Sequence, residues 1–291
     1  MKIHLAGRGY LEDIIADQKK YMRVFLVDYC RFNWVTKDMN LYLVNNTVFR
    51  KYGEDDKAYN PAELNKELFI LQSFAYINED KEIIPWIHKF KGFLLDSGAF
   101  TIFTQRSGKT NFDDYLNKYV KFINDYDVKQ FFELDIDSVV GYEKVLEYRK
   151  RLEEGTGKKC IPVWHKSRGK EEFIKTCREY PYVAIGGIVS KEITRNEYKY
   201  FPWFINQAHK HGAKIHGLGF TNLKGLQQYH FDSVDSSSWT TGNRFGFIYK
   251  FTGKTLIKIP RPDGHRVKAR EVAINNFLEW VKFSKYAEVH L

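Results

Sequence analysis

The sequence predicts an α/β protein, and the architecture that it favours is a (β/α)8 barrel of the TIM type. Eight apolar, strand-like runs occur along the chain, and a helical pattern lies between most of them. A length of 291 residues suits one barrel-sized domain, residues 1–291. An open, doubly wound sheet is the alternative. The strand-like runs are residues 2–6, 23–28, 93–96, 130–135, 160–164, 182–185, 214–217 and 231–234.

The helical patterns follow the strand-like runs in order. Residues 62–77 place Leu64, Leu68 and Leu71 on one face at helical spacing. Asn111 stands where an N-cap is expected, directly before another helical pattern. The remaining patterns are residues 10–21, 112–126, 142–152, 170–180, 195–211 and 222–229.

Two segments depart from the alternation. Residues 29–92 are too long for one strand-to-helix connection, so they are predicted to form an insertion after the second strand, over the barrel mouth. After the eighth strand, residues 240–250 and 255–259 have the pattern of a hairpin with a turn at Gly253. An amphipathic helix over residues 267–286 is expected to close the chain, so the C-terminal hairpin and helix occupy about 240–291.

The composition is typical of a soluble globular protein. Hydrophobic residues make up 43% and the mean hydropathy is −0.48. No window holds the roughly 18 uncharged apolar residues that a membrane span needs. Lys2 and Arg8 bring charge too early for a signal peptide. We therefore expect a cytoplasmic protein with no membrane partner.

The charge balance favours a polyanionic partner. The net charge is +10, from 46 basic and 36 acidic residues, and the pI is about 9.2. Nucleic acid is the simplest such partner, although a generally basic surface would give the same numbers. Cys30, Cys160 and Cys177 have no C-x-x-C spacing, which disfavours a zinc knuckle or a disulfide framework.

Basic residues are concentrated in the C-terminal hairpin and interleave there with aromatic residues. Alternation along a strand directs neighbouring side chains to opposite faces, so one face could meet phosphate groups. A solvated basic hairpin is the simpler alternative. The candidate nucleic-acid-binding residues are Arg244, Lys250, Lys254, Lys258 and Arg261.

Polar and charged residues gather at the predicted carboxyl ends of the strands, where barrel active sites lie. Paired carboxylates suit glycosidic-bond chemistry, with one as nucleophile and the other as general acid/base. Simpler roles are a helix cap for Asp96 and a tight turn for Gly186-Gly187. His165 and His216 are expected to be hydrogen-bonding groups, and no metal site is expected. The full set is Asp96, Asp135, Asp137, His165, Gly186, Gly187, His216, Gly217, Gly219, Asp232 and Asp235.

Taken in order, these segments resemble the barrel motifs of tRNA-guanine transglycosylases. That family reads D-S-G-G-[FY]-Q, F-D-E, Q-Q-G, A-V-G-G, M-G-[VI]-G and F-D-[CS]. Order and spacing agree from about residue 90 to 245, and the ordered set is more specific than any single motif. The matching segments are Leu95-Asp96-Ser97-Gly98-Ala99-Phe100, Phe132-Glu133-Leu134-Asp135, Pro162-Val163-Trp164-His165, Tyr182-Val183-Ala184-Ile185-Gly186-Gly187, His216-Gly217-Leu218-Gly219 and Phe231-Asp232-Ser233-Val234.

The resemblance implies a role for each matching position. Asp232 falls on the family nucleophile and Asp96 on its general acid/base. Phe100 falls on the aromatic residue that stacks on the base, and Asp135 on the acid that reads the guanine edge. The other implied base-binding residues are Ser97, His165, Gly186, Gly187, His216 and Gly217.

The sequence departs from the family pattern at two places, and these differences indicate which members of the family it is most similar to. The family's zinc site, C-x-C-x-x-C…H, is absent because no cysteine follows Cys177, and Trp164-His165 replaces the Gln-Gln pair. A short, zinc-free barrel is similar to the phage-type transglycosylases that place 7-deazaguanines in DNA. This implies exchange of guanine in DNA for a base such as preQ0, by double displacement through a covalent aspartyl intermediate. No metal or other cofactor is implied.

Three alternatives remain open at this point. The substrate could be tRNA instead of DNA, or the chain could be a subunit that binds a base or nucleic acid without turnover. A barrel glycosidase acting on sugars is the third. The pairing of Phe100 with Asp135 and the basic charge favour a nucleobase over a sugar.

Overall fold

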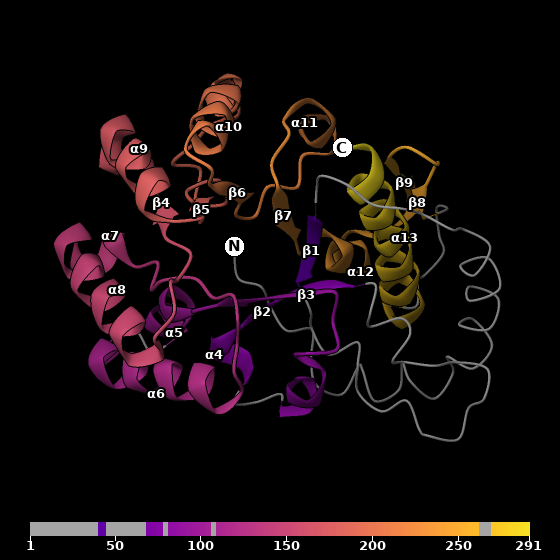
Figure 1. Cartoon of the computed structure of the whole chain (residues 1–291). Helices are drawn as coiled ribbons and strands as arrows, with labels where there is room; N and C mark the ends of the chain where they lie inside the picture. The colour runs from indigo at the N-terminus through magenta and orange to yellow at the C-terminus, as the bar shows by residue number, and fades with distance from the viewer. Residues whose placement is uncertain (1–39, 45–67, 78–80, 106–108, 262–268) are drawn as a thin grey trace.

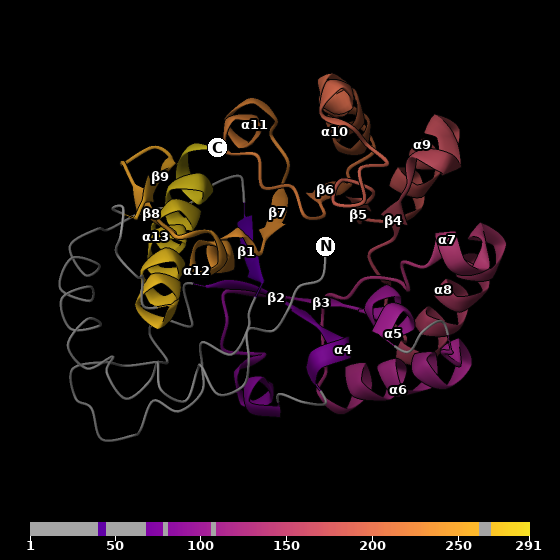
Figure 2. The same cartoon turned by 180° about the vertical axis from the view of Figure 1, so that it is seen from behind.

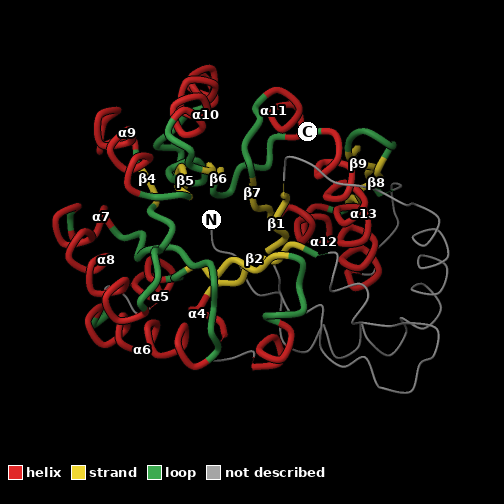
Figure 3. The backbone as a smooth tube through the Cα atoms, in the orientation of Figure 1, coloured by secondary structure: helices red, strands yellow, loops and turns green. Residues whose placement is uncertain are grey.

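The computed structural model describes residues 40–44, 68–77, 81–105, 109–261 and 269–291, and shows a mixed α/β fold (Figure 1). In Figures 1 and 3 the helices follow one another around the outside of the strands, and Figure 2 shows the same layers from behind. The strands are β1 Asn40–Val44, β2 Phe69–Ser73, β3 Gly92–Asp96, β4 Val163–Trp164, β5 Tyr182–Ile185, β6 Lys214–Gly217, β7 Ser233–Ser236, β8 Phe247–Phe251 and β9 Leu256–Pro260. The helices are α4 Phe74–Ile77, α5 Ala99–Gln105, α6 Phe112–Asp125, α7 Asp137–Val140, α8 Tyr142–Thr156, α9 Gly169–Glu179, α10 Phe201–Lys210, α11 Leu223–Gln228, α12 Gly242–Phe245 and α13 Ala269–His290, with 3-10 turns η1 Lys81–Trp86, η2 Lys166–Arg168, η3 Arg195–Tyr200 and η4 Ser238–Thr241.

Seven strands form one parallel sheet in the order β3-β2-β1-β7-β6-β5-β4, and β8 and β9 form a separate antiparallel pair. Two isolated parallel bridges involve the outer strands of the large sheet. Leu95 of β3 pairs with Phe131, and Phe132 pairs with Ile161, just before β4. Residues 131–132 therefore lie between the segments that carry β3 and β4.

The strands bury both of their faces. One set of alternate residues forms a small cluster: Phe69, Leu71, Leu94, Phe132, Ile161, Val163 and Ala184. The other set, which includes Ile70, Leu95 and Ile185, packs with the helices in a much larger cluster. Burial on both faces is why these strands are nearly continuous apolar runs in the sequence.

Most of the predicted helices are confirmed, and α6 shows why. Asn111 caps it as expected, because its Oδ1 accepts hydrogen bonds from Asp113 N and Asp114 N, both at 3.1 Å. The apolar side of α6 turns Tyr119 inward, and its hydroxyl reaches the carbonyls of Leu95 at 3.1 Å and Phe132 at 3.0 Å. One buried phenol thus links β3 to residues 131–132.

The predicted insertion over residues 29–92 is wrong in part, because β1 and β2 lie within it and occupy the middle of the parallel sheet. The predicted helix over 62–77 is also wrong where it overlaps β2. Phe69, Ile70 and Leu71 are all buried, and a short apolar run of this kind fits a buried strand and a buried helix equally well. The predicted strands 2–6 and 23–28 and the helix 10–21 lie outside the described residues.

The C-terminal hairpin and helix are confirmed, although the first hairpin strand begins at Phe247 and residues 238–245 form helical turns. Helix α13 packs beneath the hairpin, where the Tyr249 and Trp280 rings lie 5.5 Å apart. Asn276 Oδ1 also accepts the Tyr249 backbone N–H at 2.6 Å. Among the described residues, no helix combines the length and the apolar character that crossing a membrane requires.

Candidate active site

Three carboxylates meet at the carboxyl end of the parallel strands. Asp96 is the last residue of β3, Asp235 is the third residue of β7, and Asp135 follows the bridged segment 131–132. Because the strands are parallel, their carboxyl ends lie on one side of the sheet. The charges on Asp135 and Asp235 both act on Asp96, which places the three groups within electrostatic reach of one another.

Asp96 binds its proton unusually tightly. Burial is the main cause, and with the neighbouring Asp135 and Asp235 carboxylates it raises the pKa of Asp96 from 3.8 to about 6. The Ser73 side chain and, to a smaller extent, the backbone of Gly98 offset part of that rise. A carboxyl group with this pKa can both donate and accept a proton near neutral pH. The site therefore combines one proton-carrying carboxyl group with nearby carboxylates.

The predicted placement of Asp232 beside Asp96 is wrong. Asp232 precedes the first residue of β7, so it lies at the amino end of the strands, the opposite end from Asp96. There its Oδ2 accepts the Ile215 backbone N–H at 2.7 Å and contacts His209 Nε2 at 2.9 Å. These contacts join β6 to β7 and α10, which is a structural role. The acid of β7 at the carboxyl end is Asp235.

Asp235 is almost fully buried, and hydrogen bonds hold it in place. Its Oδ1 accepts the Gly219 backbone N–H from the turn after β6. His216 Nε2 lies 3.3 Å from the same oxygen. His216, predicted as a base-binding residue, is thus fully enclosed and contacts Asp235 instead of facing a pocket.

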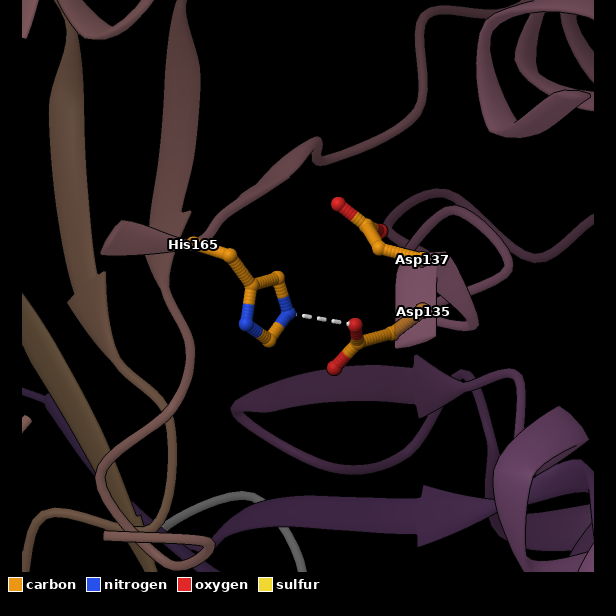
Figure 4. A group of neighbouring side chains, drawn as sticks. All are labelled: Asp135, Asp137 and His165. Atoms are coloured by element: carbon orange, nitrogen blue, oxygen red, sulfur yellow. Dashed lines mark hydrogen bonds and ion pairs between the residues drawn. The ribbon is translucent and has the colours of Figure 1, made fainter. Parts of the chain in front are cut away.

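His165 lies between the carboxylates of Asp135 and Glu192, and Figure 4 shows its hydrogen bond to Asp135. Its Nε2 is 2.6 Å from Asp135 Oδ1, and its Nδ1 is 2.8 Å from Glu192 Oε2. Burial alone would lower the pKa of His165, but the bonds to Asp135 and Glu192 outweigh it and raise the pKa to about 9. His165 is therefore an imidazolium at neutral pH and carries a positive charge at the edge of the site.

We expect His165 to make stability depend on pH. Its pKa in the folded chain is above the ordinary 6.5, so its contribution is fully present below pH 6.5 and is lost as pH rises through about 9. The free energy of unfolding should fall by on the order of 2 kcal/mol across that window. Urea unfolding at a series of pH values measures this. In His165→Gln the fall should disappear, and an unchanged fall would contradict the assignment.

A buried ion-pair network supports the loop that carries Asp135. Arg168 binds the Asp137 carboxylate with two nitrogens, and its guanidinium lies 4.2 Å from the centre of the Tyr142 ring. Arg168 also reaches Glu133, which is fully buried and binds Arg149 and the Val163 backbone N–H. Such a bidentate, stacked arginine is a rigid support.

Asp135, Asp137 and His165 could also hold a metal ion, because each offers a ligand atom within 4.8 Å of the others. Two observations weigh against it. Arg168 already engages both oxygens of Asp137, and His165 would have to lose the proton that Asp135 and Glu192 stabilise. The cluster is better described as a set of carboxylates balanced by an imidazolium and a guanidinium.

The Gly186-Gly187 pair makes room for His165 and Glu192. A Cβ on Gly186 would lie 2.9 Å from His165 Nε2. Gly187 has φ +77°, and a Cβ there would lie 2.8 Å from Glu192 Oε2. The glycines therefore allow the imidazolium and its carboxylate to pack against the end of β5, a reason that differs from the predicted contact with a planar base.

The other predicted base-site residues differ in their accessibility. Phe100, the second residue of α5, is 50% exposed, so part of its side chain is accessible to a ligand. Ser97 is buried, and its carbonyl accepts the Tyr115 hydroxyl at 2.5 Å. Gly217 packs against Phe220 and Val234 on the helix side of β6.

The predicted basic residues do not share one face of the hairpin. Lys258 pairs with Tyr249 across the strands, and its Nζ lies 4.6 Å from the centre of the Phe247 ring. Lys250 pairs with Ile257 and therefore points to the opposite face. Lys254 lies in the turn and Arg261 follows β9, both exposed. Arg244 is in α12, where its backbone alone is described.

Sequence reasoning missed Glu192 and Arg168. Glu192 lies in the loop after β5 and reaches His165 across 27 positions, and Arg168 reaches Asp137 across 31. Neither residue sits at a strand end or in a motif, so no local pattern marked it. Once His165 was identified as a site residue, a search for an acid that pairs with it could have led to Glu192.

Comparisons with known proteins give little guidance. No protein-family model matches the chain, and no curated protein matches it. A solved structure that resembles it is the carboxyl transferase domain of pyruvate carboxylase from Rhizobium etli with 3-hydroxypyruvate, at 12% identity and a TM-score of 0.40. The likeness covers 77% of this chain and 42% of that chain, so this chain spans less than half of its length. Similarity this distant carries no argument here.

Proposed function

We propose that this protein exchanges guanine in nucleic acid for a 7-deazaguanine base, by double displacement at the sugar C1′. The observation that supports it is the grouping of Asp96, Asp135 and Asp235 at one end of the sheet, with Asp96 carrying a proton up to about pH 6. A proton donor beside an ionised carboxylate is the minimum set for breaking and remaking a glycosidic bond with retention.

Each acid takes one part in this reaction. Asp235 attacks C1′ and forms an ester, while Asp96 protonates the departing guanine. The incoming base then attacks C1′, Asp96 accepts the proton from that base, and the ester bond breaks. The resemblance to transglycosylases gives Asp96 the same role, but its motif places the nucleophile at Asp232, three residues before Asp235.

The base would bind between Phe100 and the Asp135–His165 pair. The exposed ring of Phe100 offers a stacking surface. Asp135 can accept hydrogen bonds from the amino edge of a guanine-like base, and the His165 imidazolium, whose two N–H groups are engaged by Asp135 and Glu192, keeps the Asp135 carboxylate ionised and in place. A base inside a duplex would have to be flipped out or met unpaired.

The finer architecture is also part of the proposal. Residues 131–132 would be the eighth strand of a (β/α)8 barrel, since they bridge to Leu95 on one side and to Ile161 on the other. The small apolar cluster would then be the barrel interior. A cytoplasmic location fits a reaction on DNA or tRNA.

DNA is the proposed substrate, and the hairpin is its proposed phosphate-binding surface. Replacing Lys250, Lys254 and Arg261 together with Ala should weaken DNA binding. It should also flatten the log–log dependence of affinity on salt by about two to three units, because each phosphate contact on duplex DNA contributes roughly 0.9. Lys258 is kept, because it covers the Phe247 ring. Binding titrations at several salt concentrations measure the slope.

A matched variant distinguishes phosphate contacts made by the hairpin from a general effect of lowering the net charge. Replacing Lys118, Lys121 and Lys129 with Ala removes the same charge from α6 and the loop that follows it. That variant should keep the wild-type slope. Equal flattening in both variants would mean that the hairpin makes no specific phosphate contacts.

Incorporation of labelled guanine tests the function itself. The protein should incorporate label into duplex or unpaired DNA and release it when preQ0 is added. Label in tRNA alone would reassign the substrate and keep the reaction. Cleavage of sugar glycosides without base exchange would favour the glycosidase. Binding of DNA and base with no exchange would favour a non-catalytic subunit.

A further inference from the structure

A chain of polar side chains, buried except for the half-buried Tyr182, runs beneath Asp235. His216, in β6, is fully buried, and its Nδ1 lies 2.6 Å from Ser233 Oγ. Ser233 is the first residue of β7 and hydrogen-bonds the Tyr182 hydroxyl from β5. On its other side, His216 Nε2 lies 3.3 Å from Asp235 Oδ1. Four polar groups from three neighbouring strands are thus linked in series.

These groups lie on one side of the sheet. His216 pairs with Ala184 of β5 and with Ser233 of β7, and Asp235 is two residues beyond Ser233 on the same face. Ala184 belongs to the small apolar cluster, and the Phe132 ring of that cluster lies 5.4 Å from the His216 ring. In such apolar surroundings, buried polar groups must satisfy one another.

With Asp235 as a carboxylate and His216 as a neutral imidazole, the contacts fit one direction for the hydrogens. An ionised Asp235 can only accept, so His216 Nε2 must carry the hydrogen that points to it. In the neutral imidazole, Nδ1 is then an acceptor for the Ser233 hydroxyl. Ser233 Oγ can in turn accept the Tyr182 hydroxyl. Each donor in the series points toward Asp235.

We propose that His216 is a positioning residue for Asp235, held as the Nε2–H tautomer by Ser233 and Tyr182. The inference rests on the proposed function. Within the described part of the chain, the Gly219 N–H and His216 both engage Oδ1 of Asp235. Oδ2 is therefore the oxygen that attacks C1′, and Oδ1 is the oxygen whose charge the protein stabilises.

The charge on Asp235 Oδ1, which the His216 Nε2–H contacts, changes in opposite directions in the two half-reactions. In the first, the Oδ2–C1′ bond forms as the C1′–N9 bond breaks, the electron pair stays with guanine and the Asp96 proton neutralises it. Oδ1 then becomes an uncharged ester carbonyl. In the second, N9 of the incoming base bonds to C1′ and the ester electron pair returns to the carboxylate, while the proton of that base passes to Asp96. The His216 donor stabilises this returning charge, so its loss slows the second step selectively.

The first test compares His216→Leu with His216→Gln. In the Leu variant, the amount of covalent adduct relative to the rate of exchange should rise about tenfold, which corresponds to about 1.4 kcal/mol. Gln keeps an N–H donor and should restore most of the wild-type ratio. Adduct is quantified on denaturing gels with labelled DNA, and exchange by release of labelled guanine.

A packing control and a spectroscopic measurement complete the test. Ala184→Gly removes one methyl group from the same apolar cluster and should leave the ratio unchanged. Nitrogen-15 NMR of histidine-labelled protein should show His216 as the Nε2–H tautomer, and Ser233→Ala should disturb it. A Nδ1–H or doubly protonated ring, or an unchanged ratio in a folded His216→Leu protein, would overturn the proposal. Wild type that forms no adduct would reject the proposed function, while the NMR result still decides whether His216 positions Asp235.

Discussion

Asp235→Asn is expected to abolish base exchange, by more than about 10³-fold, while the protein stays folded. The amide keeps the shape of the side chain and an oxygen that can accept the Gly219 N–H, but it cannot form the ester. Labelled DNA should become covalently attached to wild type and not to the variant. Peptide mapping should place the attachment on Asp235.

Asp232→Asn is the matched control for this prediction. It makes the same chemical change only three residues earlier, at the amino end of the strands. An amide oxygen can still accept the Ile215 N–H, so activity should stay within a fewfold of wild type. Loss of activity in Asp232→Asn with normal activity in Asp235→Asn would reverse the assignment and restore the placement predicted from the motif.

The contrast between these two acids shows what the sequence could and could not predict about the site. The Phe231-Asp232-Ser233 segment matches a family motif, and Phe231 is buried like a strand residue. The strand begins one residue after Asp232, however, so Ser233 and Asp235 are the residues that share its polar face. A shift in where a strand starts moves an acid from one end of the sheet to the other, and local sequence does not fix that boundary.

The fold was predictable where each strand is followed closely by its helix. Residues 93–96, 182–185 and 214–217 were identified because buried parallel strands are apolar on both faces. β1 and β2 were missed for a different reason. Their runs are short and lie in a long segment without clear alternation. The position of β1 in the sheet also depends on its pairing with β7, far along the chain.

Asp96→Asn is expected to slow exchange by about 10²–10⁴-fold, because the amide cannot carry the proton between the two bases. For wild type, kcat/KM for the nucleic acid should fall as pH rises above about 6, where Asp96 loses its proton. The residual kcat/KM of Asp96→Asn should not show this fall with pH. Initial rates of guanine release between pH 5 and 8 would test this, since a pKa of about 6 lies inside that range.

The same substitution should make the protein more stable, which separates a catalytic acid from a helix cap. The pKa of Asp96 rises from 3.8 to about 6 on folding, so its contribution to stability is full below pH 3.8 and is lost as pH rises through about 6. At neutral pH, ionised Asp96 therefore destabilises the fold by on the order of 2 kcal/mol, and Asn removes most of that penalty. Urea unfolding of both proteins at pH 7.5 should show the variant to be the more stable. A variant that is less stable and exchanges bases within a fewfold of the wild-type rate would return Asp96 to a capping role at the start of α5, because the loss of a cap lowers stability by about 1 kcal/mol.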